Sequence, residues 1–505
     1  MTPRSLPALS WPRPNIAVIG YALYLAINAT SLWGGVFPFF PEEFHSPDLL
    51  LQFALAQSLA FSGTMAATVF LSYLRPDLVR RALIFSSGAP LAAGACLLVA
   101  GLYLPDAKPW LIPTAGVLVG MGGAGFALAW QRYFSSKAPD RGNFLLLAGT
   151  ACAPAVYLTF YLIPIAVTVY LIPLIFVPLC GLCAMLATRT IDFRQPIFED
   201  VPREHPRTYL RVMGDSWRAA VAVGSLGFAS GIIRATALSS VAMGDAVNIA
   251  SMAGALGASA VLLLVWRHGS VEVNLEAVFL ALFPLAACCL AAYPFFGPTQ
   301  MMILAGAIYL VFSFANLAMM LHCAQASRDR GVNPVLLLSF FGTIVYLVQD
   351  AGFVFGSAAN VTGQFGYQNF FIIAMAGLIV LALALYLLRG GLPIRLFARG
   401  VEGPAEAPRP APRAGASPPR TAGAGDEMTL RCRLAQDRFR LTSRECEIME
   451  AIVRGNTVAR TAEIFVLSEN TVRTHTKHIY TKLGVHRKQE MIDVLNGLEL
   501  EGAGE

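Results

Sequence analysis

Twelve runs of about twenty apolar residues fill the first 390 positions of this 505-residue chain. A run of that length crosses the hydrocarbon core of a bilayer as an α-helix, which satisfies its own backbone hydrogen bonds there. The chain is 56% hydrophobic and only 13% charged, unlike a soluble protein. The sequence therefore predicts an all-α, polytopic membrane domain over residues 1–390. The predicted spans are 16–37, 50–74, 82–104, 111–131, 144–163, 165–187, 217–238, 246–266, 275–296, 301–323, 334–357 and 368–388.

The Lys and Arg residues predict the orientation of these spans. If the N-terminus is cytoplasmic, seventeen Lys and Arg fall in inside segments and two, Lys108 and Arg234, fall outside. The other eighteen of the 37 lie from Arg389 onward. Loops rich in Lys and Arg stay on the cytoplasmic side, and an even number of spans returns the chain to that side. No small-residue cleavage site follows the first run, so we interpret it as a retained span. We expect a multi-pass protein of the prokaryotic cell membrane with both termini in the cytoplasm.

The longest internal polar loop, 188–215, divides the spans six and six. A short loop after the second span reads Arg75-Pro-Asp77 and then Arg80-Arg81. Two six-helix halves with a central cytoplasmic loop resemble the major facilitator superfamily, and the short loop is similar to that family's acidic/basic motif without its glycines. The resemblance is architectural and covers about 390 residues. It implies a transporter-like bundle that transports, senses, or only anchors the chain.

Charged and amide side chains inside the spans are the candidates for an intramembrane site. Arg234 and Asp350 each lie sixteen residues from the cytoplasmic start of an outward-running span, a depth of about 24 Å. Equal depth makes a salt bridge possible, and unpaired charges are costly in the membrane. We expect Asp350, with Gln349 and Arg234, to line an outward-facing polar pocket. Alternatively, Arg234 reaches the outer interface and Asp350 makes a structural hydrogen bond.

Small residues in the spans predict packing and not chemistry. Five glycines crowd the span 111–131 and should let a neighbouring helix approach closely. All nine cysteines fall in spans or in the cytoplasmic tail, so no disulfide is expected. Cys180 and Cys183 form a CxxC within an apolar helix, which we interpret as small buried side chains. The glycines are Gly116, Gly120, Gly122, Gly123 and Gly125.

The composition changes abruptly after the last span. Residues 391–428 are rich in Ala, Pro and Gly and cannot bury a core, so we expect a partly stiff linker. Residues 429–500 then show helical periodicity. Thr442 with Glu445 three positions later is a capping box, and Gly455 ends that helix. A second helix is predicted at 458–465 and a third at 469–483, after an N-cap at Ser468.

The third of these helices has two faces. Val472, His475, Ile479 and Leu483 fall on one stripe, which we expect to pack on the other helices. The opposite stripe carries hydrogen-bonding and cationic groups and suits a DNA major groove. A solvated amphipathic helix would explain the charge alone. The groups on the opposite stripe are Asn470, Arg473, Thr474, Lys477 and Thr481.

The order of residues favours DNA binding. From Leu441 the chain reads LT-x-RE, a Gly, then A-E-x-(apolar)-x-L-S-E-N-T-V-R-x-H-x-x-x-I-x-x-K-L-G-V. This order closely resembles the LuxR/FixJ-type helix-turn-helix over about sixty residues, 437–497, with the motif itself at about 457–483. At the position before Ala462, this family usually has Ile, and this chain has Thr461 instead. The resemblance implies base contacts by Arg473, Thr474 and Lys477, phosphate contacts by Ser468, Thr471 and Lys482, and a structural His475. With Asn470, the predicted DNA-binding residues are Ser468, Asn470, Thr471, Arg473, Thr474, Lys477 and Lys482.

These features together predict a membrane-bound, one-component transcription regulator. The bundle would sense an unknown small molecule, and the tail would bind double-stranded operator DNA as a homodimer, paired through residues 487–498 with Met491, Ile492 and Leu495. The alternatives are a secondary transporter with a regulatory DNA-binding tail, and a bundle that is only an anchor. We find no nucleophile triad, nucleotide loop or zinc spacing in the tail, so no catalytic residue, metal or cofactor is predicted and the chain is not expected to be an enzyme.

Overall fold

A computed structural model describes most of the chain, in two compact units. The first unit lies within residues 1–399 and the second begins at Gly400. Every regular element in the described residues is helical, which confirms the all-α prediction. The described residues are 15–30, 46–199, 201–203, 205–237, 241–268, 273–361, 367–389, 424–439, 441–465, 469–485 and 488–498.

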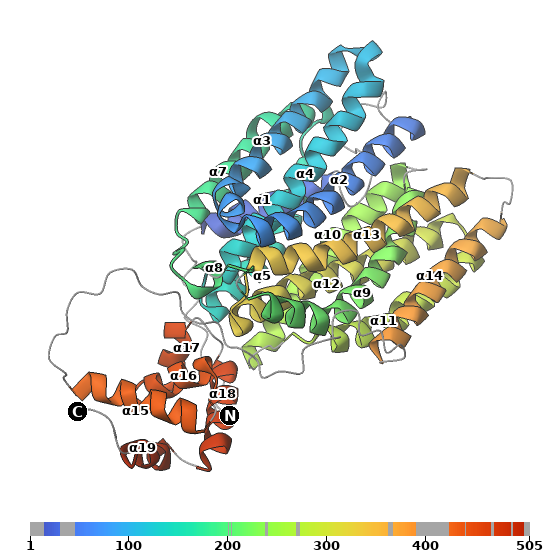
Figure 1. Cartoon of the computed structure of the whole chain (residues 1–505). Helices are drawn as coiled ribbons and strands as arrows, with labels where there is room; N and C mark the ends of the chain where they lie inside the picture. The colour runs from blue at the N-terminus through green and yellow to red at the C-terminus, as the bar shows by residue number, and fades with distance from the viewer. Residues whose placement is uncertain are drawn as a thin grey trace. The chain divides into compact units, whose positions relative to one another are not determined.

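The first unit begins with long helices that run back and forth (Figure 1). The first predicted span appears as a 13-residue helix, and the residues from 31 to 45 lie outside the described part. The predicted sixth span is broken by a π-helical segment at Ile172–Phe176, where Pro173 removes a backbone donor. The helices of this half are α1 (Ile16–Asn28), α2 (Pro47–Leu74), α3 (Pro76–Tyr103), η3 (Pro105–Ala107), α4 (Lys108–Ser135), α5 (Pro139–Tyr161), α6 (Ile165–Leu171), η4 (Ile172–Phe176) and α7 (Val177–Thr188).

The second half follows a segment that is partly helical. The predicted loop 188–215 contains a short helix, α8, and its last ten residues form the start of α9. Helix α15 begins at Ala424, within the range predicted as the linker, 391–428. The helices here are α8 (Pro196–Glu199), α9 (Pro206–Ala237), α10 (Val241–His268), α11 (Leu275–Ala292), η5 (Tyr293–Phe295), α12 (Pro298–Arg330), α13 (Pro334–Val361) and α14 (Tyr367–Leu388).

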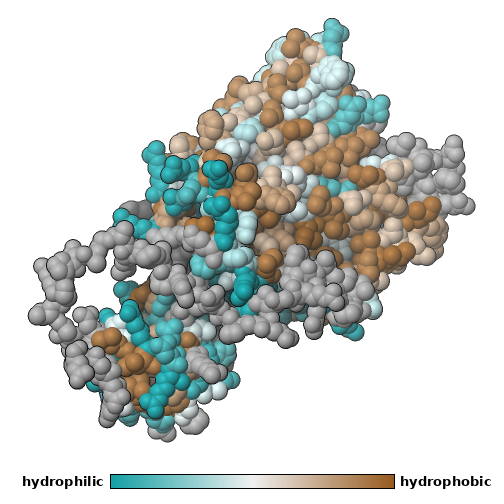
Figure 2. Space-filling view, viewed as in Figure 1, coloured by the Kyte–Doolittle hydropathy of each residue, from teal (hydrophilic) through white to brown (hydrophobic). Residues whose placement is uncertain are grey.

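The membrane character of the unit is visible on its surface. Eleven helices among the described residues are long and apolar enough to cross a bilayer, and α1 is apolar but shorter. Large side chains such as Phe85, Trp110 and Leu162 are about four-fifths exposed, and brown hydrophobic atoms cover much of the visible face (Figure 2). In water such a surface would aggregate, whereas in lipid it is solvated.

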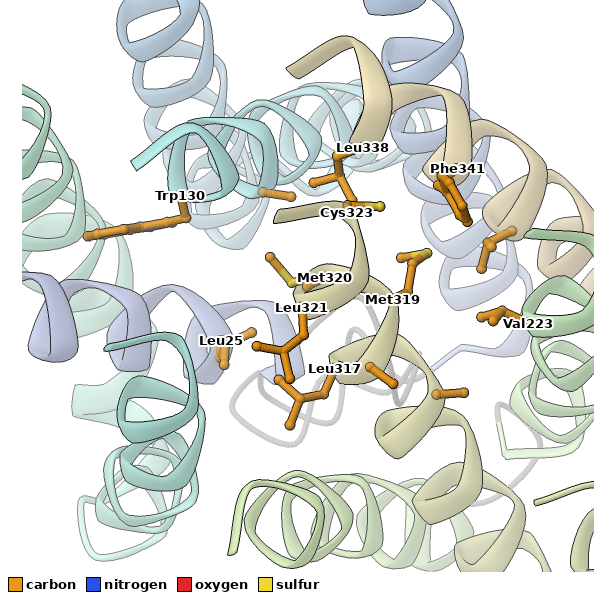
Figure 3. Packing of buried hydrophobic residues seen from close by; sticks show 14 of the residues in the cluster. Leu25, Trp130, Val223, Leu317, Met319, Met320, Leu321, Cys323, Leu338 and Phe341 are labelled. Carbon is orange, nitrogen blue, oxygen red and sulfur yellow. The ribbon is translucent and has the colours of Figure 1, made fainter. Parts of the chain in front are cut away.

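The middle of helix α12, residues 317–323, is buried on several sides. Leu317, Met319, Met320, Leu321 and Cys323 leave it in different directions and are all less than a tenth exposed (Figure 3). Helices α1, α4, α9 and α13 surround them and contribute buried side chains to the same cluster. A helix apolar on every side belongs in the centre of a large bundle.

Glycines of α4 allow the close helix contacts that their crowding predicted. A Cβ on Gly116 would lie 2.8 Å from the Phe53 carbonyl oxygen of α2, and one on Gly122 would lie 2.6 Å from the Leu91 Cβ of α3. Gly120 likewise meets the Gln57 carbonyl oxygen. These positions have no room for a side chain, which is the small-residue packing of membrane bundles.

The second unit is a small helical domain with its own core. Helix α16 is the capping-box helix, α17 and α18 form the helix-turn-helix, and α15 precedes them. Fifteen buried residues make up its core, among them Ile448, Met449, Val472 and Ile479, which are fully buried. The helices are α15 (Ala424–Arg438), α16 (Ser443–Val453), α17 (Val458–Phe465), α18 (Glu469–Leu483) and α19 (Lys488–Asn496).

Candidate nucleic-acid interface and intramembrane polar cluster

Glu445 holds the start of α16 and the end of α18 together. The Thr442 amide donates to Glu445 Oε2 at 2.8 Å, and the Glu445 amide donates to Thr442 Oγ1 at 3.2 Å, which completes the predicted capping box. Lys482 Nζ on α18 lies 2.6 Å from the same Oε2, and the Glu445 side chain is only 5% exposed. Burial alone would raise the pKa of Glu445, but the bonds from Lys482 and Thr442 hold it below its usual value.

Arg444 fastens the next helix to this corner. Its Nη2 donates to the Phe465 carbonyl oxygen at 3.1 Å, and its guanidinium lies 4.7 Å from the centroid of the Phe465 ring. Its Nη1 also pairs with Glu447 Oε2 at 2.8 Å. A guanidinium that stacks on a ring and bonds a helix's last carbonyl fixes the end of α17, directly before the turn into α18. The helix pair is therefore positioned by side chains of α16.

The packed face of α18 is the predicted one. Val472, Ile479 and Leu483 are buried in the core, and His475 is half-buried. Burial, followed by the charge of Arg444, lowers the pKa of His475, so its neutral form is favoured at neutral pH. This agrees with a structural role for His475. On the opposite face, the side chains of Lys477 and Thr481 are described and are exposed.

The predicted DNA-binding residues are only partly described. Lys477 lies on α18 with an exposed side chain, as a base contact requires. Lys482 is 35% exposed at its side chain and is held by Glu445, so its predicted phosphate contact would share the amine with that carboxylate. Asn470, Thr471, Arg473 and Thr474 occupy positions on α18, but their side chains lie outside the described part, and Ser468 lies outside it altogether.

Helix α19 does not offer the pairing surface that was expected of it. Met491 and Leu495 are fully buried in the domain's own core, and α19 packs beside α15 and α18. Ile492 is half-buried. The expectation that Met491 and Leu495 pair two copies of the protein is wrong. Their helical spacing defines one apolar face, and such a face can equally pack inside a single domain.

In the membrane unit, Arg234 and Asp350 both contact α2. Arg234 Nη1 donates to Ser58 Oγ at 2.5 Å, and Ser62 Oγ, one turn along α2, donates to Asp350 Oδ2 at 2.7 Å. No direct ion pair joins Arg234 to Asp350 within 4.0 Å in the described residues. The serines therefore connect the two charges in place of a salt bridge. Gln349 Nε2 bonds Ser230 Oγ of α9 at 3.3 Å.

Arg234 is enclosed by protein. Its side chain is 3% exposed, and its guanidinium lies 4.9 Å from the centroid of the Phe353 ring of α13. Its Nε and Nη2 are buried and have no hydrogen-bond partner among the described residues. An arginine that reached the outer interface would be hydrated, so that alternative does not hold for Arg234. Asp350 and Gln349 are each 7% exposed and belong to the same polar cluster.

The C-terminal unit matches a known family. Residues 440–495 match the GerE family, which is described as the luxR family of bacterial regulatory proteins. The spore germination protein GerE of Bacillus subtilis is 40% identical over 62 residues, which are 84% of that protein and 12% of this chain. The chain belongs to the luxR family of bacterial regulatory proteins. The match therefore spans most of GerE and a small part of this chain.

The membrane unit is similar to transporters in its helix arrangement. FucP, an E. coli major facilitator superfamily transporter in the outward conformation, has a TM-score of 0.48 and 13% identity. A bacterial homologue of the iron transporter ferroportin, outward-facing, has a TM-score of 0.47 and 12% identity. Each alignment covers 74% of this chain and 98% of the other. With TM-scores below 0.5, these similarities assign this luxR-family chain neither a transport activity nor a substrate.

Two sets of contacts at these sites were missed in the sequence, and one residue that was noted there has an unexpected environment. The Glu445–Lys482 ion pair of the luxR unit spans 37 positions, and only the crossing of α16 and α18 brings it together. Ser58 and Ser62 are ordinary residues of an apolar helix, and the partners that give them a role are on α9 and α13. Thr461, which was recognised as a departure, is fully buried, and its hydroxyl has no hydrogen-bond partner in the described residues.

Proposed function

We propose that this protein is a membrane-bound, one-component transcription regulator. The observation that carries the proposal is a luxR-family domain in one chain with eleven helices capable of crossing a membrane. A bundle that only anchors the chain is an alternative, and the buried charges Arg234 and Asp350 favour a bundle that controls the DNA-binding domain. We find no receiver or kinase domain in the sequence, so the signal would pass within the chain. The cytoplasmic side of the prokaryotic cell membrane is where such a domain meets DNA.

The luxR unit would read operator DNA with α18. Arg473, Thr474 and Lys477 would contact base edges in the major groove, and Ser468, Thr471 and Lys482 would contact phosphates, with Asn470 beside them. Two copies would bind together, as the symmetry of half-sites in such operators favours. Since Met491 and Leu495 are buried, the pairing contact would use other residues of the domain.

Genome-wide occupancy of the intact, membrane-bound protein tests this assignment. We expect the unaltered protein to give discrete peaks of DNA occupancy. These peaks should disappear in the Arg473→Ala/Lys477→Ala variant, because each base contact is worth about 1–3 kcal/mol. Arg433→Ala/Lys488→Ala is the matched control, since it removes the same charge from exposed positions of α15 and α19. Equal loss in both double variants would mean that the protein binds DNA by charge alone. Peaks that persist in Arg473→Ala/Lys477→Ala would contradict the assignment.

The polar cluster of Arg234, Gln349 and Asp350 would be the sensing site. It lies where α2, α9 and α13 meet, and Arg234 has two donors without partners in the described residues. A small molecule with an acceptor group would satisfy those donors and would favour the arrangement of helices in which they are reached. The signal would be a difference in affinity between two states of the bundle.

The second candidate is a secondary transporter with a regulatory tail. Buried intramembrane charges such as Arg234 and Asp350 also occur on transport pathways, so the cluster favours this candidate as well. The two functions differ in what the occupancy experiment returns. No peaks under any growth condition would favour transport, and discrete peaks lost in the α18 variant favour the regulator.

A further inference from the structure

A small cavity lies where the two halves of the membrane unit meet at one end. Its volume is about 60 Å³, room for a few water molecules or one small ion. The start of α3, the end of α4 and the start of α13 contribute to it, together with the region of α8. The Lys and Arg distribution assigns this end to the cytoplasm. The residues that line the cavity include Asp77, Arg80, Arg132, Phe198 and Asn333.

Arg132 reaches this cavity from inside the protein. Its side chain is 2% exposed, and its Nη1 donates to the Arg80 carbonyl oxygen at 2.9 Å. The guanidinium also lies 5.5 Å from the centroid of the Phe193 ring. Its Nε is buried and has no hydrogen-bond partner among the described residues. A buried cation with an unused donor is costly, and an anion in the cavity beside it would balance the charge of the guanidinium.

Further positive charge surrounds the cavity. Arg80 lines it and lies 6.0 Å from the same Phe193 ring. The long helices α3 and α13 both begin at it, at Pro76 and Pro334, and helix N-termini favour anions. Asp77 opposes this with a carboxylate 3.4 Å from Arg80 Nη2, but its side chain is 76% exposed and therefore well screened. Among the described side chains that line the cavity, two arginines face one screened carboxylate, so their balance of charge is positive.

We propose that this cavity binds one small anion of the phosphate type, with Arg132 and Arg80 as its ligands. The volume suits a single phosphate group. Free phosphate and the headgroup of an anionic lipid share this chemistry. Bound between α3 and α4 of the first half and α13 of the second, the anion holds the two halves together at this end. The inference goes beyond DNA binding and does not depend on it.

Binding of inorganic phosphate to the purified full-length protein tests the proposal. We expect labelled phosphate to bind and to raise Tm, whereas chloride at equal ionic strength does not. In Arg132→Gln the affinity should fall by about tenfold or more, because a charge-assisted hydrogen bond is lost. Arg81→Gln is the matched control, since Arg81 is exposed beside Arg80 and does not line the cavity. An equal response of Arg132→Gln and the unaltered protein would overturn the proposal.

A second variant and a lipid arm complete the test. Asp77→Asn removes the opposing carboxylate and should tighten phosphate binding about three- to tenfold, a gain that cannot come from misfolding. In nanodiscs, phosphatidylglycerol is compared with phosphatidylcholine. If Tm rises with phosphatidylglycerol alone, and the rise needs Arg132, the anion is a lipid headgroup. No response to either source, in the unaltered protein and in Asp77→Asn, refutes the site.

Discussion

Two buried polar side chains of the luxR unit show how a single residue can stabilise or weaken the same small core. Glu445 is buried with its capping and ionic partners in place, so its desolvation is compensated. Thr461 is buried with a hydroxyl that has no partner in the described residues. The difference lies in the neighbours and not in the degree of burial. Each residue gives a prediction of its own.

Replacement of the unpartnered hydroxyl should stabilise the luxR unit. We expect Thr461→Val to raise the free energy of unfolding by about 1 kcal/mol, because a methyl group replaces a buried hydroxyl that forms no hydrogen bond. Chemical denaturation of residues 424–505 measures the change. Thr481→Val is the control, since Thr481 is exposed and its hydroxyl bonds its own helix, at Lys477 O, at 2.9 Å. A less stable Thr461→Val protein would show that the hydroxyl is satisfied after all.

The stability of the luxR unit should depend on pH through Glu445. Its pKa is held below the usual value near 4.5, so its contribution is complete above that pH and is lost as pH falls through the lower folded-state pKa. Glu445→Gln should reduce stability by about 1–3 kcal/mol at pH 6 and flatten its fall toward pH 3. Denaturation at several pH values tests this. Glu447→Gln, whose partner pair with Arg444 is more exposed, should change little. Parallel pH curves for Glu445→Gln and the unaltered unit would refute the assignment.

At the scale of helices, much could be predicted from the sequence. The capping box at Thr442, the stop at Gly455 with its φ of 95°, and the bounds of α17 and α18 follow from local chemistry that acts within a few residues. The positions at which α9 and α15 begin could not be predicted this way. Their first turns are polar, and a polar stretch extends a helix only when the rest of the helix is anchored. Helix α19 was expected to pack against a second copy, but it packs within its own domain. An apolar stripe shows which face of a helix is buried, and it does not show which surface covers that face.

The contact between α2 and α4 should depend on Gly120. A Cβ there would meet the Gln57 carbonyl oxygen and would lie 3.0 Å from the Ala60 Cβ. Gly120→Ala should therefore destabilise the membrane unit by about 1–3 kcal/mol through overpacking. Gly63→Ala on α2 is the matched control, since nothing lies within 4 Å of its added Cβ. Thermal unfolding of the full-length protein in detergent compares them. Equal Tm values would mean that α2 and α4 can separate without cost.

At the scale of the whole molecule, the sequence shows two regions of opposite composition, and the structure forms two compact units. The luxR unit has its own core, and its match to GerE is nearly complete. The membrane unit has its own core and its own polar cluster. The Ser58–Arg234 and Ser62–Asp350 contacts could not be predicted, because they depend on how three distant helices pack. Two units that are complete by themselves are suited to a division between sensing and DNA binding.

That division predicts different effects for changes in the two units. Residues 424–505 alone should occupy the same genomic sites as the intact protein, since α18 and its supports lie within them. Asp350→Asn in the intact protein should leave the list of sites unchanged and alter only how occupancy responds to growth conditions, because Asp350 and its partner Ser62 both belong to the membrane unit. Occupancy of the three proteins under several conditions is the measurement. If Asp350→Asn abolishes all occupancy while the protein remains in the membrane at normal abundance, the charge is needed for DNA binding itself, and the bundle is more than a sensor. If the isolated unit responds to conditions as the intact protein does, the signal does not pass through the bundle.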